Sequence, residues 1–293
     1  MNRAADVPLV LGGHSFISQL GNDPPASEPE QRAIVAACLD GGIRWIDTTY
    51  QPERVALGRV LEALGRRGEA TILAWNFFTH FSPGDSVGGP APYRPGHIDL
   101  ILEQLRTSFV DCLVLVPLPD VDENRRQEEL MREWQRRGYV RSLGLWIEDP
   151  ALIGRYRAGD PFRLAIRPFN VATGEVAPVF RACKASGWET VATSPFFRGW
   201  ELDKVLAAAA ARGHGEAGAL RPVLADLMLR FSLFHAEVDR VIVAMRRVEW
   251  IARNLASVSR GRLTDEEHRR LRRLRGLASG RPRWWQRLPW RAR

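Results

Sequence analysis

The chain has 293 residues, of which 45% are hydrophobic and 26% are charged, and its formal net charge at pH 7 is +8. This length suits one large α/β barrel or two smaller domains, and no hydrophobic run reaches the roughly 18 residues of a membrane-spanning helix. The segment from Met1 to Pro8 lacks the pattern of a secretory signal. Cys38, Cys112 and Cys183 are odd in number and far apart, which argues against a disulfide framework and against a zinc site. We therefore expect a globular protein of the reducing cytoplasm that holds no metal.

From the N-terminus onward, short hydrophobic runs alternate with amphipathic segments. The runs with the pattern of buried strands are 9–16, 43–46, 70–76, 111–117, 142–147, 164–170, 190–196 and 241–245. The segments with helical spacing are 28–39, 53–64, 97–108, 122–137, 150–156, 173–186, 219–234, 248–255 and 264–275. Eight strands that are each followed by a helical segment predict a single (β/α)8 TIM barrel over residues 1–276.

A polar cluster follows the second expected strand. Asp47, two Thr residues and Tyr50 come directly after the hydrophobic residues 43–46, and a helix is expected to begin near Glu53. Since parallel α/β barrels carry their functional groups at the C-terminal ends of the strands, this cluster is the first place to look for a site. Arg44, inside the expected strand, is interpreted as an ion-paired barrel residue.

The same segment resembles the aldo-keto reductases. In that family the second strand ends in Asp-Thr-Ala, followed by a Tyr and then by Ser-Glu and Leu-Gly at the next helix. The order is matched here by Asp47-Thr48-Thr49, Tyr50, Glu53 and Leu57-Gly58. Three later segments of this chain also resemble sequence motifs of the family, namely Gly138-Tyr139-Val140-Arg141, Arg167-Pro168-Phe169-Asn170 and Ser194-Pro195. The resemblance covers residues 9–274 and implies a (β/α)8 barrel, NADP(H) as the cofactor and a small-molecule carbonyl compound as the substrate.

The resemblance also implies four catalytic groups, namely an Asp, a Tyr acid, a Lys that lowers the Tyr pKa and a His that orients the carbonyl. Asp47 and Tyr50 match the first two, although Tyr50 lies about two positions nearer the Asp than the family's Tyr does. The Lys position falls at Trp75 and Asn76, and the His position falls at Val116. The catalytic set is therefore expected to be incomplete.

Two histidines could replace the missing one. His14 and His80 are expected on loops at the same end of the barrel. The alternative is that each is only a polar residue of a surface loop. Both are kept as catalytic candidates together with Asp47 and Tyr50.

The expected cofactor-binding residues follow from the resemblance as well. Those at the nicotinamide end are Arg167, which takes the place of the family's Gln, Asn170 and Ser194. Those at the phosphate end are Arg198, Arg246, Arg247 and Asn254. The two adjacent arginines precede an expected helix N-terminus, which is a natural place for a phosphate. The alternative for this set is a solvated basic rim, since the chain is rich in arginine.

The C-terminal segment 277–293 departs from the barrel pattern. Within it, residues 280–293 alternate Arg and Trp and include two Pro residues that disfavour a long helix. This tail is either a disordered basic end or an anchor that contacts an anionic membrane surface or a partner protein. Nucleic acid is not expected as a partner, because the basic residues are not accompanied by a recognisable nucleic-acid-binding motif.

Three functions remain open at the level of sequence. The first is a divergent, NADPH-dependent aldo-keto reductase that uses Asp47 and Tyr50. The second is a catalytically inactive relative, a pseudoenzyme that keeps the scaffold as a binding or partner protein. The third is a non-redox enzyme that uses His14, His80, Asp47 and Arg167 at the mouth of the barrel. A shared fold does not decide among them.

Overall fold

The computed structural model describes residues 6–17, 26–78, 88–156, 160–173, 176–196 and 199–277. Eight parallel strands pair in sequence order, and β1 closes the barrel by pairing with β8. The strands are β1 (Leu9–Leu11), β2 (Trp45–Thr48), β3 (Thr71–Trp75), β4 (Val110–Leu115), β5 (Val140–Trp146), β6 (Phe162–Pro168), β7 (Glu189–Thr193) and β8 (Arg240–Val243). The predicted (β/α)8 TIM barrel is confirmed.

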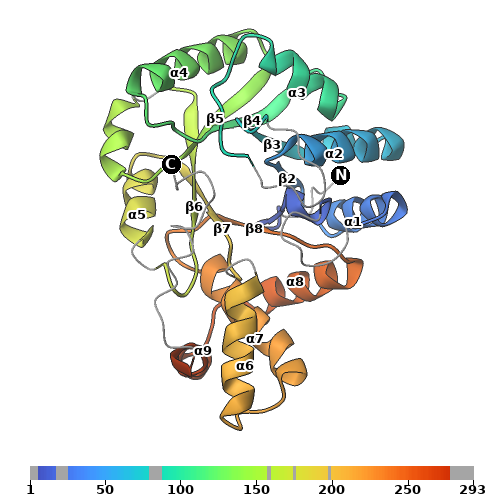
Figure 1. The fold of residues 1–293 in the computed structure, drawn as a ribbon, viewed down its shortest axis with the longest axis vertical. Helices are drawn as coiled ribbons and strands as arrows, with labels where there is room; N and C mark the ends of the chain where they lie inside the picture. The colour runs from blue at the N-terminus through green and yellow to red at the C-terminus, as the bar shows by residue number, and fades with distance from the viewer. Residues whose placement is uncertain are drawn as a thin grey trace.

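Helices surround the strands (Figure 1). The α-helices are α1 (Glu28–Asp40), α2 (Gln51–Leu64), α3 (His97–Leu105), α4 (Val121–Arg136), α5 (Ala177–Ala185), α6 (Trp200–Ala211), α7 (Ala217–Leu233), α8 (Val248–Arg260) and α9 (Asp265–Leu277). The 3-10 helices are η1 (Gly13–Ser15), η2 (Arg67–Glu69) and η3 (Pro150–Arg155). The segment after β5, expected as a short helix, is therefore the 3-10 helix η3.

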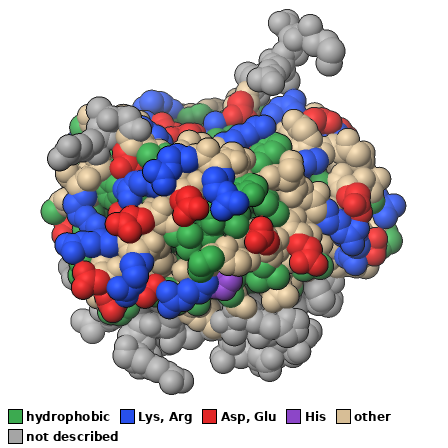
Figure 2. All heavy atoms as spheres, turned by 90° about the horizontal axis from the view of Figure 1, so that it is seen from above, with side chains coloured by type: hydrophobic (Ala, Val, Ile, Leu, Met, Phe, Trp, Pro, Cys, Tyr) green, Lys and Arg blue, Asp and Glu red, His purple; other side chains and the backbone are tan. Residues whose placement is uncertain are grey.

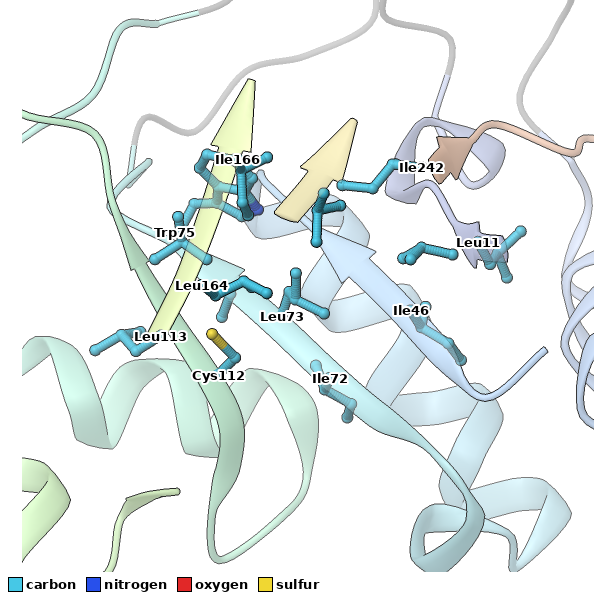
Figure 3. Close-up of a cluster of buried hydrophobic side chains, with 14 of the residues drawn as sticks. Leu11, Ile46, Ile72, Leu73, Trp75, Cys112, Leu113, Leu164, Ile166 and Ile242 are labelled. Atoms are coloured by element: carbon cyan, nitrogen blue, oxygen red, sulfur yellow. The ribbon is translucent and has the colours of Figure 1, made fainter. Parts of the chain in front are cut away.

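The barrel is held by a continuous hydrophobic core. Strands β1 and β4 are buried at every residue, as expected for parallel strands that are covered on both faces. Figure 3 shows hydrophobic side chains from several strands packed together inside this part of the molecule. Those labelled are Leu11, Ile46, Ile72, Leu73, Trp75, Cys112, Leu113, Leu164, Ile166 and Ile242. The three cysteines are free and buried.

Strand β2 runs further than the hydrophobic pattern suggested. The sequence placed its end at Ile46, but Asp47 and Thr48 continue the strand by pairing with Leu73 and Ala74 of β3. The reason is that backbone pairing, not side-chain polarity, decides where a strand ends. Arg44 lies just before the strand, and its guanidinium is 3.5 Å from the Glu69 carboxylate, which confirms the expected ion pair.

A second hydrophobic cluster lies beside the barrel, where α6, α7 and α9 gather at the lower end of the view in Figure 1. Helix α6 was absent from the expected elements. Its last residues are a run of Ala, whose small side chains weaken the periodic pattern, although Leu202, Val205 and Leu206 are buried. Buried Arg230 of α7 joins this layer together by donating to both carboxylate oxygens of Glu267 on α9, at 2.6 and 3.0 Å.

The charges on the surface are mixed in sign where Figure 2 shows them, with basic and acidic side chains interspersed among hydrophobic ones. Several surface arginines form ion pairs with carboxylates of α4; Arg94 and Arg126, for example, both pair with Glu123. No helix in the described part of the chain is long and hydrophobic enough to cross a membrane. The basic tail 280–293 lies outside the described residues, so its expected membrane or protein contact stays a prediction, as does a cytoplasmic location.

Candidate active site

The candidate site is centred on Asp47, near the C-terminal end of β2. The side chain is buried, with 5% of its surface exposed. The indole Nε1–H of Trp75, the last residue of β3, donates a hydrogen bond to Oδ1 of Asp47. The hydroxyl of Thr49 donates a longer bond of 3.4 Å to Oδ2. Asp47 is thus a buried carboxylate whose hydrogen-bond donors are neutral groups.

This environment disfavours the charged form of Asp47. Burial, followed by the nearby charge of Glu53, raises the pKa of Asp47 from its ordinary value of 3.8 to about 7, against the opposing effects of the Trp75 hydrogen bond and of His14. A carboxyl group with a pKa near neutrality can hold or release a proton at physiological pH. Asp47 therefore has the electrostatics of a functional group and not of a surface carboxylate.

Glu53 and His14 form the second part of the site. Glu53 lies in the first turn of α2, is fully buried, and accepts hydrogen bonds at Oε2 from the backbone N–H groups of Thr49 (2.6 Å) and Tyr50 (3.1 Å). His14 lies on η1 directly after β1, and its Nδ1 is 2.9 Å from Oε1 of Glu53. The structure thus brings two carboxyl groups and an imidazole together from two neighbouring strands.

Tyr50 faces this group from the start of α2. It is buried, its ring lies 5.8 Å from the His14 ring, and its edge packs on Phe77 at 5.2 Å. Three of the four predicted catalytic residues, Asp47, Tyr50 and His14, therefore meet in one place. His80 lies outside the described residues, so its role stays a prediction.

A buried arginine fixes the loops around the site. Arg54 is fully buried and donates to the Gln104 side chain (2.7 Å), to the Thr49 carbonyl (3.1 Å) and to the Phe77 carbonyl (2.9 Å). Burial lowers the pKa of Arg54 to about 10. Because its donors join the end of β2 to the segment after β3, Arg54 holds Tyr50 and its neighbours in position.

The two positions at which the sequence resemblance implies a Lys and a His have structural roles here. Asn76 is fully buried and exchanges hydrogen bonds with the backbone of Val116, at 2.8 and 3.0 Å, which ties the end of β3 to the end of β4. The chain has only two lysines, Lys184 and Lys204. Lys184 pairs with Asp239, which precedes β8 at the other end of the barrel, and Lys204 lies on α6. Neither lysine comes from an element that supplies the Asp47 group.

The residues predicted for the nicotinamide end come from two neighbouring strands: Arg167 lies on β6, Asn170 just after β6, and Ser194 just after β7. Asn170 is buried and donates to the Ser194 carbonyl (3.0 Å), and its own carbonyl oxygen accepts from the backbone of Ala172 (3.0 Å). Ser194 has a positive φ of 57°. Arg167 donates to the Ile147 carbonyl (2.9 Å). Asn170 and Ser194 are brought together, and these hydrogen bonds are internal to the protein, so their role in cofactor binding stays a prediction.

The residues predicted for the phosphate end gather at β8 and α8. Arg246 donates to the backbone carbonyls of His14 (3.1 Å) and Ile17 (3.0 Å), so it links this region to the His14 loop. Arg247 is exposed at the N-cap of α8, where no side chain caps the helix, and Asn254 is half-buried two turns further along. Arg198 lies outside the described residues.

Three contributors were not predicted as site residues. The sequence identified Glu53 only as a match to the family motif, Arg54 only as part of an expected helix, and Trp75 only as a residue at the position of the missing lysine. A glutamate at the third position of a helix is an ordinary capping residue, and this pattern does not reveal a contact with a His 39 positions earlier. Arg54 did offer a signal in the sequence: it lies at helical spacing from Leu57 and Leu61, on the hydrophobic face of the expected helix, where an Arg is buried only when its donors are satisfied.

The described residues also line a cavity of about 510 Å³, but it lies at the opposite end of the barrel. Its walls come from the beginnings of β1, β7 and β8 and the segments before them, and include Asp6, Lys184, Trp188 and Arg240. None of the predicted site residues is among them. In (β/α)8 barrels this end serves stability, so the Asp47 group remains the candidate active site.

Comparison with known proteins decides the family. The sequence model of the aldo/keto reductase family matches residues 8–275. The chain belongs to the aldo/keto reductase family. No curated protein sequence matches it at a significant level.

Solved aldo-keto reductases share the fold. One from Bacillus halodurans, in its holo form, is 20% identical over 91% of each chain, with a TM-score of 0.67. One from Klebsiella pneumoniae, solved in complex with NADPH, is 18% identical over 92% of each chain, also with a TM-score of 0.67. A further structure from Klebsiella pneumoniae, with NADP and acetate, has the same identity, coverage and TM-score. At such low identity these similarities establish the barrel architecture and not the chemistry.

Proposed function

We propose that this chain is an oxidoreductase that uses NADPH to reduce a small carbonyl compound at the C-terminal end of its barrel. The observation that carries the proposal is the convergence of Asp47, Tyr50 and His14 at the ends of β1 and β2. Membership of the aldo/keto reductase family supplies the reaction class.

The phosphate end of the nucleotide fits the residues at β8 and α8. Among the described residues, no side chain caps the first turn of α8, and of its backbone N–H groups that of Trp250 donates to the Arg247 carbonyl (3.0 Å). An anion can approach the helix N-terminus beside the exposed Arg247. Asn254 lies along the same helix. Arg246 supports this region through the His14 loop instead of offering all its donors to a ligand.

The bound nucleotide supplies a hydride to the carbonyl carbon. The protein must then bind the carbonyl compound, keep it oriented and deliver one proton to its oxygen. Tyr50, His14 and Asp47, whose pKa is raised to about 7, are the groups of the site that can carry such a proton. Trp75 and Asn76 occupy the position of the expected Lys, so the proton donor works without a lysine ammonium. We expect turnover to be slower than a complete catalytic set would allow, by about 10²-fold or more.

A second function is favoured by the same replacement. The position of the implied Lys is occupied by Trp75 and Asn76, and that of the implied His by Val116. A barrel with these replacements could bind the nucleotide without turning it over, and would then act as a binding protein. The two proposals make the same prediction for binding and opposite predictions for turnover.

A titration with NADPH separates them. The chain contains ten Trp residues, so binding is followed by quenching of intrinsic fluorescence, and turnover of an aldehyde panel is followed by NADPH absorbance. The variant Arg247→Gln should weaken binding about tenfold, by removing one phosphate contact. The control Arg125→Gln, on the exposed face of α4, should bind as the wild type does. If NADPH does not bind, both proposals are wrong.

A further inference from the structure

The carboxylate of Glu53 is held in one orientation. Its Oε2 receives the two backbone N–H groups of Thr49 and Tyr50, and the side chain has no exposed surface. These two hydrogen bonds hold Oε2 in place and leave Oε1 as the other face of the carboxylate. The orientation of Oε1 is therefore fixed by the backbone at the start of α2.

Oε1 has no aligned hydrogen-bond donor among the described residues, although it is fully buried. The nearest polar contact is Nδ1 of His14, at 2.9 Å. A buried carboxylate oxygen needs a donor, and a lone pair on Nδ1 at this distance would repel it. A small rotation of the His14 ring aligns an Nδ1–H with Oε1 and satisfies both atoms.

The contact depends on a glycine beside it. A Cβ atom at Gly13 would lie 2.2 Å from Oε2 of Glu53 and 2.8 Å from the carbonyl oxygen of Asp47. Only a residue without a side chain lets η1 approach this closely. The backbone of η1 thus presses against the same carboxylate that its His14 side chain contacts.

From these contacts we infer that Glu53 is a positioning residue, which keeps a proton on Nδ1 of His14 so that Nε2 is the nitrogen that delivers a proton to the substrate. This inference rests on the proposed function, because it assigns the proton donor of the carbonyl reduction. The His14 side chain is 28% exposed and Glu53 is not exposed at all, so the pair extends from the interior toward solvent.

For this step His14 must start as the imidazolium, with one proton on each nitrogen. When a bound nicotinamide gives a hydride to the carbonyl carbon, the π electron pair would move to the oxygen, and His14 would give that oxygen its Nε2 proton to form a hydroxyl group. His14 is left neutral, with its remaining proton on Nδ1 facing Glu53, and regains a proton from solvent.

Other charged or titratable groups face this pair. Asp47 interacts with both Glu53 and His14, and the guanidinium of Arg54 interacts with Glu53. The phenol ring of Tyr50 lies beside the His14 ring, and the guanidinium of Arg246 donates a hydrogen bond to the backbone carbonyl of His14. None of these contacts supplies a donor to Oε1. Glu53 is therefore the group that determines which His14 nitrogen carries the proton in the neutral ring.

The tautomer can be measured directly by ¹⁵N NMR of the imidazole rings at pH 9, where a neutral ring shows one pyrrole-like and one pyridine-like nitrogen. His14→Gln identifies the His14 signals among the six histidines. In the wild type we expect the pyrrole-like nitrogen to be Nδ1. In Glu53→Gln, the amide oxygen can still accept from the backbone while the amide N–H₂ faces Nδ1, so the proton should move to Nε2.

This measurement needs neither nucleotide nor turnover, so its result is independent of whether the proposed function holds. A wild-type ring protonated at Nε2, or the same tautomer in both proteins, would overturn the inference. For the reaction itself, Glu53→Gln should lower kcat about 10²-fold with little change in KM, whereas Glu53→Asp should recover part of the rate. An equal loss of kcat in the Asp and Gln variants would contradict a role in positioning the proton. A thermal unfolding scan of each variant verifies that it is folded.

Discussion

Replacing Asp47 by Asn tests the electrostatics of the site without requiring a ligand. The pKa of Asp47 is raised from 3.8 to about 7, mainly by burial. One pKa unit corresponds to about 1.4 kcal/mol, so the charged carboxylate costs the folded protein up to about 4 kcal/mol. Asn is never charged, and its amide oxygen can still accept the hydrogen bond from Trp75.

The sign of the pH dependence follows from proton binding. Since the pKa of Asp47 is higher in the folded than in the unfolded chain, the folded protein binds more protons between about pH 4 and pH 7. The contribution of Asp47 to stability is therefore largest at low pH and is lost as the pH rises through about 7. The Asn variant lacks this loss, so its free energy of unfolding relative to the wild type should increase by about 2 to 3 kcal/mol from pH 5 to pH 8.

Urea denaturation at pH 5, 6, 7 and 8, followed by tryptophan fluorescence, measures this difference. The other titrating groups are common to both proteins and largely cancel. Asp99→Asn, at an exposed carboxylate on α3, is the matched control and should show no comparable trend. A difference between Asp47→Asn and the wild type that stays constant with pH, or that shrinks as the pH rises, would refute the assignment of a raised pKa to Asp47.

Three further variants test separate parts of the account. Tyr50→Phe should lower kcat for aldehyde reduction at least about 10²-fold if the phenol donates a proton, and steady-state kinetics that match the wild type would exclude that role. Arg54→Met should destabilise the fold by about 3 kcal/mol or more in urea denaturation, since three buried acceptors lose their donor; a loss below about 1 kcal/mol would show that the loops are held by other contacts. Gly58→Ala should also destabilise the fold, by about 2 kcal/mol or more, because its Cβ would lie 2.3 Å from the Gln104 carbonyl oxygen of α3. The control Gly68→Ala has open space around the added carbon and should change the stability by less than about 1 kcal/mol. Similar effects of the two substitutions would contradict the close packing of α2 on α3.

The sequence was sufficient for the barrel because hydrophobic runs and helical spacing are local signals. Every strand was found, since most residues of each strand are buried and form a short hydrophobic run. Helix α6 was missed because a run of Ala has little periodicity. The end of β2 was placed early because Asp47 and Thr48 are polar, although both pair with β3.

The candidate site could be predicted only in part, for a different reason. Asp47 and Tyr50 follow a strand that the sequence reveals, and His14 follows another, so their shared end of the barrel was accessible to reasoning. The hydrogen bond from Trp75 and the contact between His14 and Glu53 depend on how neighbouring strands are staggered, which no local pattern encodes. Arg246 was assigned to a phosphate, but its donors reach the His14 loop, which the sequence could not show.

Hydride transfer itself is the most direct test of the central claim. The full chain is incubated with NADPH that carries deuterium at C4 of the nicotinamide and with an aldehyde panel, and the alcohol products are analysed by mass spectrometry. The account predicts a deuterated alcohol with the wild-type protein and at least about 10²-fold less with the double variant of Tyr50→Phe and His14→Gln. Bound NADPH without any deuterated alcohol, or equal product from the double variant, would contradict a reduction carried out by the Asp47 group.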